Sequence, residues 1–425
     1  MNTPIHDFLM NYAASGTLRC HMPGAKGVSY PLDITEIDGA DSLYESSGII
    51  ARSEEIAAKL FGAEKTLFSC SGSTLSIQTM LGLARAASGK NRVSAARYAH
   101  KSLISTAVTL GMDVDWIYPD EYLSAAVSPQ AVERSITADT AAVFINSIDY
   151  YGGMCDIKAV SAVCKAHGVP LLADNAHGAY LVFTDSHPIR NGAAMTADSA
   201  HKTLPCITGG AYLHIADGNL VPRSKEIMAL YGTSSPSYLI LDSLDLCNQH
   251  IAEEKQKAEA AFSAVEELKK RLSEKGLSLR KSDMLRVTVN AYEMGMSGFE
   301  LADRLREKGV ECEMCDRNNV IFLFSTITTK ADAERLYNAL TSIRSKKPVE
   351  RFNVPVLTPA KAMPPREAFF RKVSATPVPQ AVGKICGGIY APCPPCVPLI
   401  MPGEIIDSTC AEVLLKYGCQ YIETL

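Results

Sequence analysis

Short apolar runs alternate with helical apolar periodicities along the first half of the chain. The runs predict buried strands: Lys65–Phe68, Arg92–Ala96, Val114–Tyr118, Ala141–Ile145, Val169–Asp174 and Ala211–Ile215. Apolar residues recur at helical spacing between them: Ser53–Gly62, a stretch from Gly72 to Leu83, Ser128–Ile136, and a stretch that ends near His167. This alternation predicts an α/β fold, with a mostly parallel sheet covered by helices on both faces.

The second half of the chain predicts a smaller α/β domain. A long helical pattern from His250 to Gly276 precedes a strand–helix–strand order, and a proline-studded tail follows Lys347. We therefore expect three parts: an N-terminal arm (1–50), a large cofactor-binding domain (51–250), and a C-terminal domain with the linking helix and the tail (251–425).

Composition and charge narrow the class of protein. The 425 residues are 47% hydrophobic and 21% charged, with a formal net charge of −4, as in a soluble globular protein without a nucleic-acid partner. No apolar run approaches the roughly 20 residues that cross a bilayer, so no membrane segment is expected. The first residues, Met1–Asp7, lack the order of a signal peptide, which predicts a cytoplasmic protein.

The thirteen cysteines are spread along the chain, and we expect reduced thiols. Two pairs have the spacing of metal ligands, Cys312 with Cys315 and Cys393 with Cys396. The pairs are far apart in sequence and the second lies in a proline-rich run, so we expect no metal site.

Candidate chemistry centres on Lys202, which lies among small residues, a histidine and a hydroxyl in Ser199–Thr203. A lysine in this setting suggests a Schiff base with a carbonyl cofactor, of which pyridoxal phosphate (PLP) fits best. Asp174 ends an apolar run upstream and is suited to pair with the pyridinium proton of PLP. Each motif alone also has a structural interpretation without catalysis: a lysine near a helix start, and an aspartate that caps a loop.

A second segment, Ser69–Thr74, places hydroxyls and a glycine at the start of a helical stretch. Backbone N–H groups there are able to bind a phosphate, although an ordinary helix cap explains the same pattern.

Together these motifs resemble those of the ornithine/lysine/arginine decarboxylase family, in its short form without an N-terminal receiver-like domain. The matching segments follow the family's order through nearly the whole chain: Gly72–Thr74, Arg97–Ser102, Tyr150–Gly152, Asp174–Gly178, Ser199–Leu204, Ser235–Tyr238 and Pro402–Glu404. The resemblance implies the aspartate aminotransferase fold (PLP fold type I), a homodimer or higher homo-oligomer with shared active sites, and decarboxylation of lysine, ornithine or arginine to an amine of polyamine metabolism.

The resemblance also implies roles for single residues. Lys202 would hold the cofactor, Asp174 would pair with the ring nitrogen, and His100 would stack on the ring. The remaining cofactor contacts would come from Ser73, Thr74, His177, Ser199, His201, Ser235 and Ser237, the last two reaching the neighbouring subunit's phosphate.

Two roles stay open at this point. Glu404 is the candidate for contact with the distal cation of the substrate. Alternatively, Glu404 is a solvated acid on a loop. The proton returned to Cα would come from His201 or from a nearby tyrosine.

This chain departs from the family at several positions. The family usually has His where this chain has Ala25, Glu at Asn175, Thr near Asp149, and an aromatic residue and a glycine at Cys393 and Cys396. Substrate identity is therefore the open part of the hypothesis. An aminotransferase, a β-eliminating lyase or a non-catalytic PLP-binding protein are the alternatives.

Overall fold

The computed structural model describes residues 1–22, 25–121, 124–392 and 397–425. The chain forms two compact units. The first comprises 1–87, 170–263 and 324–329, and the second comprises 88–169, 264–323 and 330–425. Among the described residues, no helix combines the length and the apolar character needed to cross a membrane.

The first unit carries four strands in the order β1-β7-β6-β5. β5 and β6 are parallel, whereas β7 is antiparallel to both of its neighbours. Its elements are α1 (Pro4–Ala14), α2 (Ile49–Phe61), β1 (Lys65–Ser69), α3 (Gly72–Ser88), β5 (Leu171–Asp174), β6 (Met195–Asp198), α7 (Ala200–Thr203), β7 (Ala211–Ile215), α8 (Ser224–Ala229) and α9 (Tyr238–Glu253).

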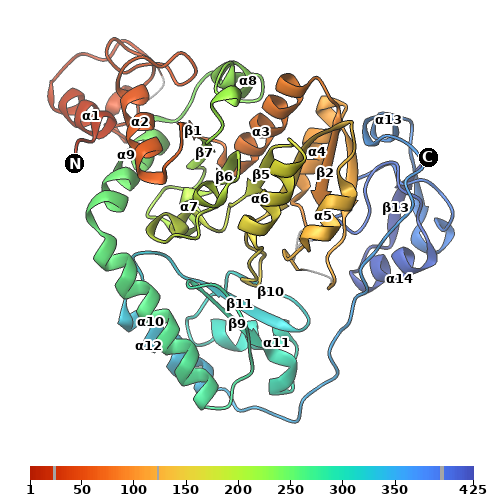
Figure 1. The fold of residues 1–425 in the computed structure, drawn as a ribbon. Helices are drawn as coiled ribbons and strands as arrows, with labels where there is room; N and C mark the ends of the chain where they lie inside the picture. The colour runs from red at the N-terminus through yellow and green to blue at the C-terminus, as the bar shows by residue number, and fades with distance from the viewer. Residues whose placement is uncertain (23–24, 122–123, 393–396) are drawn as a thin grey trace. The chain divides into compact units, whose positions relative to one another are not determined.

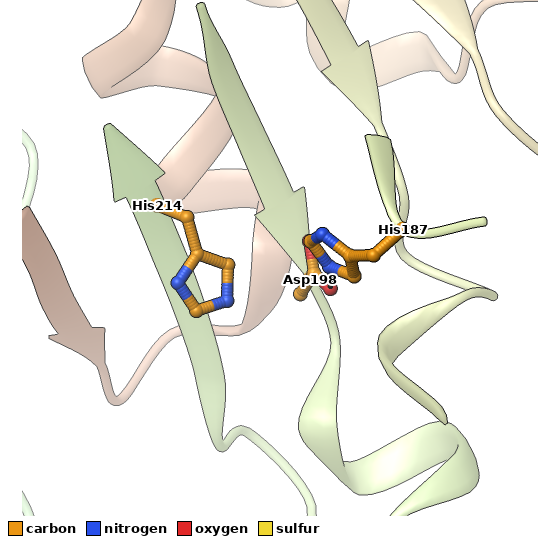
Figure 2. A group of neighbouring side chains, drawn as sticks. All are labelled: His187, Asp198 and His214. Atoms are coloured by element: carbon orange, nitrogen blue, oxygen red, sulfur yellow. Dashed lines mark hydrogen bonds and ion pairs between the residues drawn. The ribbon is translucent and has the colours of Figure 1, made fainter. Parts of the chain in front are cut away.

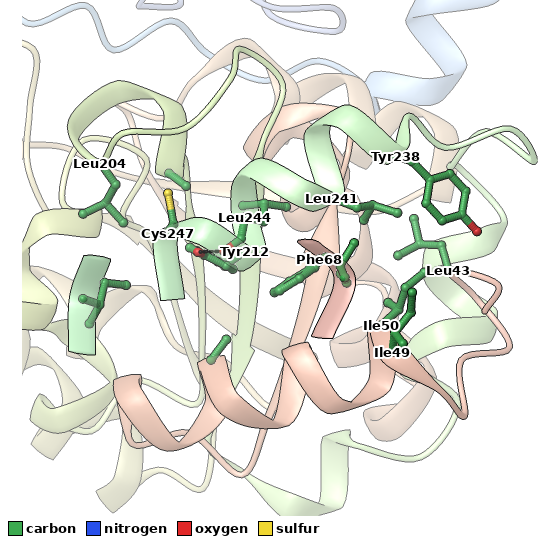
Figure 3. Close-up of a cluster of buried hydrophobic side chains, with 14 of the residues drawn as sticks. Leu43, Ile49, Ile50, Phe68, Leu204, Tyr212, Tyr238, Leu241, Leu244 and Cys247 are labelled. Carbon is green, nitrogen blue, oxygen red and sulfur yellow. Dashed lines mark hydrogen bonds between the residues drawn. The ribbon is translucent and has the colours of Figure 1, made fainter. Parts of the chain in front are cut away.

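A large apolar cluster fills one face of these strands. Figure 3 shows Phe68 of β1 and Tyr212 of β7 beside Leu241 and Leu244 of α9. The pairing of β1 with β7 explains why the two rings share a face, because Phe68 lies opposite Tyr212 and directly opposite residues point to the same side of a sheet. Helices α1, α2 and α9 pack on one another over this core (Figure 1).

The second unit contains β2 (Arg92–Ala96), which pairs in parallel with β3 (Asp113–Ile117) and with β4 (Thr140–Asn146). A separate four-stranded antiparallel sheet has the order β10-β11-β9-β8. The strands of that sheet and the other elements of the second unit are α4 (Lys101–Leu110), α5 (Pro129–Ser135), α6 (Ile157–Ala166), β8 (Leu279–Arg280), β9 (Arg286–Asn290), α11 (Gly298–Arg306), β10 (Met314–Cys315), β11 (Asn319–Leu323), α12 (Lys330–Thr341), α13 (Pro365–Phe369), β12 (Ser374–Pro377), α14 (Ser408–Lys416) and β13 (Tyr421–Thr424).

The helical pattern that we assigned to His250–Gly276 as one helix forms parts of two. Helix α9 ends at Glu253, and α10 runs from Lys255 to Glu274. Glu254 between them has φ −113° and ψ 27°, outside the helical region, and its side chain contacts His250 and Lys257. The five residues Glu253–Lys257 are polar but include no glycine or proline, so the sequence alone does not reveal the break.

The proline-studded tail is a folded element with its own core. Strands β12 and β13 pair antiparallel, and Val378, Ile406, Leu414 and Ile422 belong to one buried cluster. The structure thus confirms the α/β class with a large, mostly parallel sheet and a smaller C-terminal α/β part. The boundaries at residues 50 and 250 stay a prediction.

Candidate active site

Lys202 lies on the short helix α7, which begins two residues after strand β6 ends. Its side chain is half-buried, and Nζ lies 3.1 Å from Nε2 of His177. His177 follows strand β5, so the ends of two adjacent parallel strands deliver the amine and the imidazole to one place. This edge is where ligands bind in open α/β sheets.

Asp174 is the last residue of β5 and is 5% exposed. Its Oδ1 accepts a hydrogen bond from the backbone N–H of Ala176 at 3.1 Å. Burial raises the pKa of Asp174, while the Ala176 N–H and the charge of Lys202 act in the opposite direction. The structure places Asp174 at the buried end of a strand, as predicted, and its pairing with a pyridinium nitrogen stays a prediction.

The segment at the start of α3 lies beside the Lys202 loop. Gly72 has φ +64°, and its N–H donates to the Gly209 carbonyl oxygen at 2.8 Å. A Cβ on Gly72 would lie 3.9 Å from Cε1 of His201, which places this imidazole next to the first turn of α3. Ser73 and Thr74 follow in that turn, where backbone N–H groups lack helical partners. This geometry fits the predicted phosphate cradle.

His201 is oriented by the loop that follows Lys202. Its Nδ1 lies 2.9 Å from the Gly210 carbonyl oxygen, so Nδ1 carries a proton and donates a hydrogen bond to that oxygen. The backbone N–H of His201 bonds to the same oxygen at 3.2 Å. The ring is thereby fixed between Gly210 and the start of α3.

Three predicted serines occupy other positions of the first unit. Ser199 is buried and directly precedes α7, and Ser237 is half-buried and directly precedes α9. Ser235 is exposed in the preceding loop. Cys70 donates to the carbonyl oxygen of Ser237 at 3.8 Å, so the start of α9 touches the turn between β1 and α3.

His100 belongs to the second unit, where it caps helix α4. Its Nδ1 accepts from the backbone N–H of Ser102 at 3.2 Å and lies 2.9 Å from the Ser102 hydroxyl. Its stacking on a cofactor ring stays a prediction.

Glu404 is buried at 2% exposure rather than solvated on a loop. Its carboxylate accepts from Arg97 at 2.5 and 3.0 Å and from the Trp116 indole at 2.9 Å. The backbone N–H of Met401 donates to it as well, at 2.9 Å. Contact between Glu404 and a substrate cation stays a prediction, and it would require the carboxylate to share these four donors.

Sequence reasoning missed two buried polar groups. It assigned no role to Arg97, although Arg97 is 4% exposed and pairs with Glu404. It also missed His187, Asp198 and His214, which are fully buried and lie together in the first unit. No local motif signals them, because pairing of β6 with β7 brings His214 near Asp198, and the loop before Pro188 brings His187 there.

The cysteine pairs give no further support to a metal site. Burial is the largest cause of the raised pKa of both Cys312 and Cys315, the latter to about 11, so both are thiols in the metal-free protein, and the absence of a metal there stays a prediction. Cys393 and Cys396 lie outside the described residues.

Comparison with protein families identifies the chain. A model of the Orn/Lys/Arg decarboxylase major domain matches residues 3–292, and the C-terminal domain model of the same family matches residues 344–422. The chain belongs to the Orn/Lys/Arg decarboxylase family. The departures at Ala25 and Asn175 therefore occur within a decarboxylase.

Individual relatives agree with this assignment. The arginine decarboxylase of Bacillus subtilis is 28% identical over 458 aligned positions, covering 97% of this chain and 93% of that protein. A Francisella novicida lysine decarboxylase structure superposes with a TM-score of 0.82 at 16% identity, covering 100% of this chain and 81% of the other. A structure described as SPT with PLP has a TM-score of 0.56 at 13% identity, covering 71% and 80%.

The residues of this decarboxylase fit the cofactor that its family implies. Lys202 supplies an amine, Asp174 a buried carboxylate, and the first turn of α3 a set of N–H and hydroxyl donors. An aldehyde, a pyridinium nitrogen and a phosphate are the three groups of PLP that such residues recognise.

Proposed function

We propose that this protein is a PLP-dependent decarboxylase that converts a basic L-amino acid into CO2 and the corresponding amine of polyamine metabolism. The contact between Lys202 Nζ and His177, beside the buried carboxylate of Asp174, supports this most directly. Arginine is the first substrate to test, because the B. subtilis relative is named an arginine decarboxylase. We further propose that the enzyme is a cytoplasmic homodimer.

The protein residues would each have a distinct task. PLP, when bound, supplies an electron sink for the charge left at Cα when CO2 departs. Asp174 would hold the proton on the ring nitrogen by charge attraction in a low-dielectric site. Lys202 would hold the cofactor covalently, and His177 would position the Lys202 amine.

The proton that returns to Cα needs a donor on the Lys202 side. Nδ1 of His201 donates a hydrogen bond to the Gly210 carbonyl oxygen, so Nε2 is the ring atom that would carry a proton to Cα. A tyrosine is the alternative donor. Ser73, Thr74, Ser199, Ser235 and Ser237 would bind the phosphate, and His100 would contact the ring.

Borohydride reduction of the purified protein tests the attachment site. A pyridoxyl mass should appear on the peptide that carries Lys202 and on no other. Lys225, a lysine of the same unit that pairs with Glu54 at 2.7 Å, is the internal control. Label on a different lysine would refute the assignment.

Product analysis with L-arginine, L-lysine and L-ornithine tests the reaction. The proposal predicts CO2 together with the matching amine from at least one of them, and none from Lys202→Ala. A 2-oxo acid would indicate an aminotransferase instead, and an eliminated side chain would indicate a lyase. Cofactor binding without any product would indicate a non-catalytic protein.

A further inference from the structure

The helix that carries Lys202 is only one turn long. Helix α7 comprises Ala200–Thr203, and the backbone N–H of Leu204 donates to the Ala200 carbonyl oxygen at 2.8 Å. A single helical turn has little stability of its own, because it fixes several backbone angles for one hydrogen bond. The position of the Lys202 amine therefore depends on the contacts that the rest of the first unit makes with α7.

Thr203, the last residue of α7, is fully buried and is held from two sides. Its hydroxyl oxygen accepts from the backbone N–H of Tyr180 at 3.3 Å, and Tyr180 belongs to a short 3-10 helix (Ala179–Phe183). Its carbonyl oxygen accepts from the backbone N–H of Thr326 at 3.0 Å. This second contact comes from the segment Phe324–Thr329, which follows strand β11 and packs as part of the first unit.

The side chain of Thr326 is fixed by a histidine of α9. Thr326 is fully buried, whereas Ile327 next to it is 52% exposed. The Thr326 hydroxyl lies 2.9 Å from Nε2 of His250, which is itself buried. This hydrogen bond ties the segment Phe324–Thr329 to α9.

The opposite side of the His250 ring is fixed as well. Its Nδ1 lies 2.9 Å from a carboxylate oxygen of Glu254, the residue at the break between α9 and α10. An ionised carboxylate only accepts, so Nδ1 carries a proton, and Nε2 of the neutral ring accepts a hydrogen bond from the Thr326 hydroxyl. The ring of Phe183 meets the imidazole edge-on, with centroids 5.8 Å apart. A continuous chain of contacts thus leads from Glu254 to Thr203.

We propose that Thr326 and His250 are positioning residues for Lys202: the hydrogen bond between them holds the segment Phe324–Thr329 on α7 and so fixes the amine where it bonds to the aldehyde of the cofactor. The inference rests on the proposed function, because that aldehyde belongs to PLP. The bond forms between the amine nitrogen and the aldehyde carbon with release of water, so it depends on where the amine lies. Neither positioning residue needs to touch the cofactor.

The hydroxyl of Thr326 can be removed with little change in the shape of the side chain. Thr326→Val keeps the backbone N–H that bonds to Thr203 and takes the hydroxyl away from Nε2 of His250. Thr326→Ser keeps the hydroxyl. His250→Leu breaks the same hydrogen bond from the α9 side, and it stands in for Thr326→Val if that protein does not fold.

A second buried hydrogen bond between a threonine and a histidine of the first unit provides the matched control. Oγ1 of Thr66 on β1 lies 2.8 Å from Nδ1 of His214 on β7, and both residues are at most 1% exposed. Figure 2 shows His214 on the strand beside the one that carries Asp198, so this bond lies among the strands rather than at α7. Thr66→Val therefore removes the same kind of hydrogen bond elsewhere in the unit.

The experiment measures the affinity of the full chain, freed of bound cofactor, for two ligands: PLP, and deoxypyridoxine phosphate, in which a methyl group replaces the aldehyde. Only PLP can bond to Lys202, so the ratio of the two affinities reports the placement of the amine. Thr326→Val should weaken PLP binding by about tenfold, the size of one buried hydrogen bond, and leave binding of the analogue unchanged. His250→Leu should change the ratio in the same way. Thr326→Ser and Thr66→Val should keep the wild-type ratio.

Equal loss of affinity for both ligands in Thr326→Val would show a purely structural role and overturn the inference. A ratio that stays unchanged in Thr326→Val and His250→Leu would overturn it as well. So would an equal change in Thr66→Val, or a ratio in Thr326→Ser as low as that of Thr326→Val. A wild-type protein that binds PLP no more tightly than the analogue would instead refute the attachment of PLP to Lys202 in the proposed function, so the two failures are distinguishable.

Discussion

Asp174 combines burial with a nearby positive charge, and this combination defines its chemical role. Asp174 is 5% exposed, and loss of solvation raises the pKa of its carboxyl. The positive charge of Lys202 partly offsets this rise. A pyridinium proton would provide the compensating positive charge. The interaction would be strongest when negative charge develops on the substrate.

Asp174→Asn should keep the fold and much of the PLP affinity, because the change is nearly isosteric. It removes the charge that stabilises the protonated ring in the transition state, so kcat should fall more than KM rises. A preorganised contact of this kind contributes about 3 kcal/mol, or roughly a hundredfold in rate. Steady-state kinetics on the basic amino acid that is turned over measures this. A near wild-type kcat would show that Asp174 is not the partner of the ring nitrogen.

His214 predicts a pH dependence of stability. Its pKa is about 3 in the folded protein against 6.5 for an unperturbed imidazole, because burial disfavours the charged ring. Below about pH 6.5 the unfolded chain therefore binds a proton that the folded protein does not. Stability is lost as the pH falls from that value towards 3, by at most about 1.4 kcal/mol per pH unit from this residue.

Thermal unfolding between pH 8 and pH 5 checks the His214 prediction. His214→Gln should unfold with a weaker pH dependence than the wild type. His167→Gln, which changes a side chain 39% exposed, should follow the wild-type curve. A constant difference between wild type and His214→Gln across this range would contradict the prediction.

At the scale of elements, the sequence predicted strands better than it predicted helix ends. Arg92–Ala96 and Ala211–Ile215 were predicted with the bounds that the structure has, because short buried runs have sharp polar borders. The break at Glu254 was missed because no glycine or proline marks it and its neighbours are good helix formers. The tail was assigned to the C-terminal domain without any predicted strand, whereas β12, which ends in Pro377, pairs with β13.

The buried pair of Arg97 and Glu404 connects the chain just after strand β2 to the C-terminal tail within the second unit. The guanidinium also bonds to the Leu399 carbonyl oxygen at 3.0 Å and lies 4.6 Å from the centre of the Trp116 ring. Both side chains are at most 5% exposed, so neither charge is solvated when its partner is lost. Removing one partner of such a pair is strongly destabilising.

Glu404→Gln should therefore lower the free energy of unfolding by about 3 kcal/mol or more, measured by chemical denaturation. Glu226→Gln is the control, because its pair with Arg223 has both side chains about two-thirds exposed, at 67% and 66%. That change should have less than about 1 kcal/mol of effect. An unchanged stability of Glu404→Gln combined with a large rise in KM would instead support a contact between Glu404 and the substrate cation.

At the scale of the whole molecule, local sequence patterns predicted the class of fold correctly, and the position of the cofactor site stays a prediction. Asp174 was placed correctly at the end of a strand because an apolar run leads up to it, whereas β6, the strand before Lys202, was not predicted. The Asp198 cluster could not be predicted, because Asn175, His187 and His214 meet Asp198 only through strand register and loop packing. The partners of Glu404 were unpredictable for the same reason, since Arg97 is 307 residues away in sequence.

The oligomeric state is a property of the assembly rather than of one chain. Large apolar side chains are exposed in the N-terminal segment of the first unit: Leu18 at 83%, Val28 at 84% and Tyr30 at 62%. Leu230, a few residues before the loop with Ser235, is 76% exposed. Side chains of this kind in one unit are typical of a surface that another protein covers, and a second copy of this chain fits the family resemblance.

We therefore expect the active, PLP-loaded protein to be at least a dimer by multi-angle light scattering. Leu18→Ser with Val28→Ser should shift the population towards monomer, because each change removes an apolar side chain that the second copy would bury. Exchanging the exposed Phe370 of the second unit for Ser, at 67% exposure, is the control and should leave the mass unchanged. If Ser235 and Ser237 reach a neighbour's phosphate, the monomer-shifted variant should also lose PLP affinity. A PLP-loaded monomer with full activity would rule out both the dimer and the shared site.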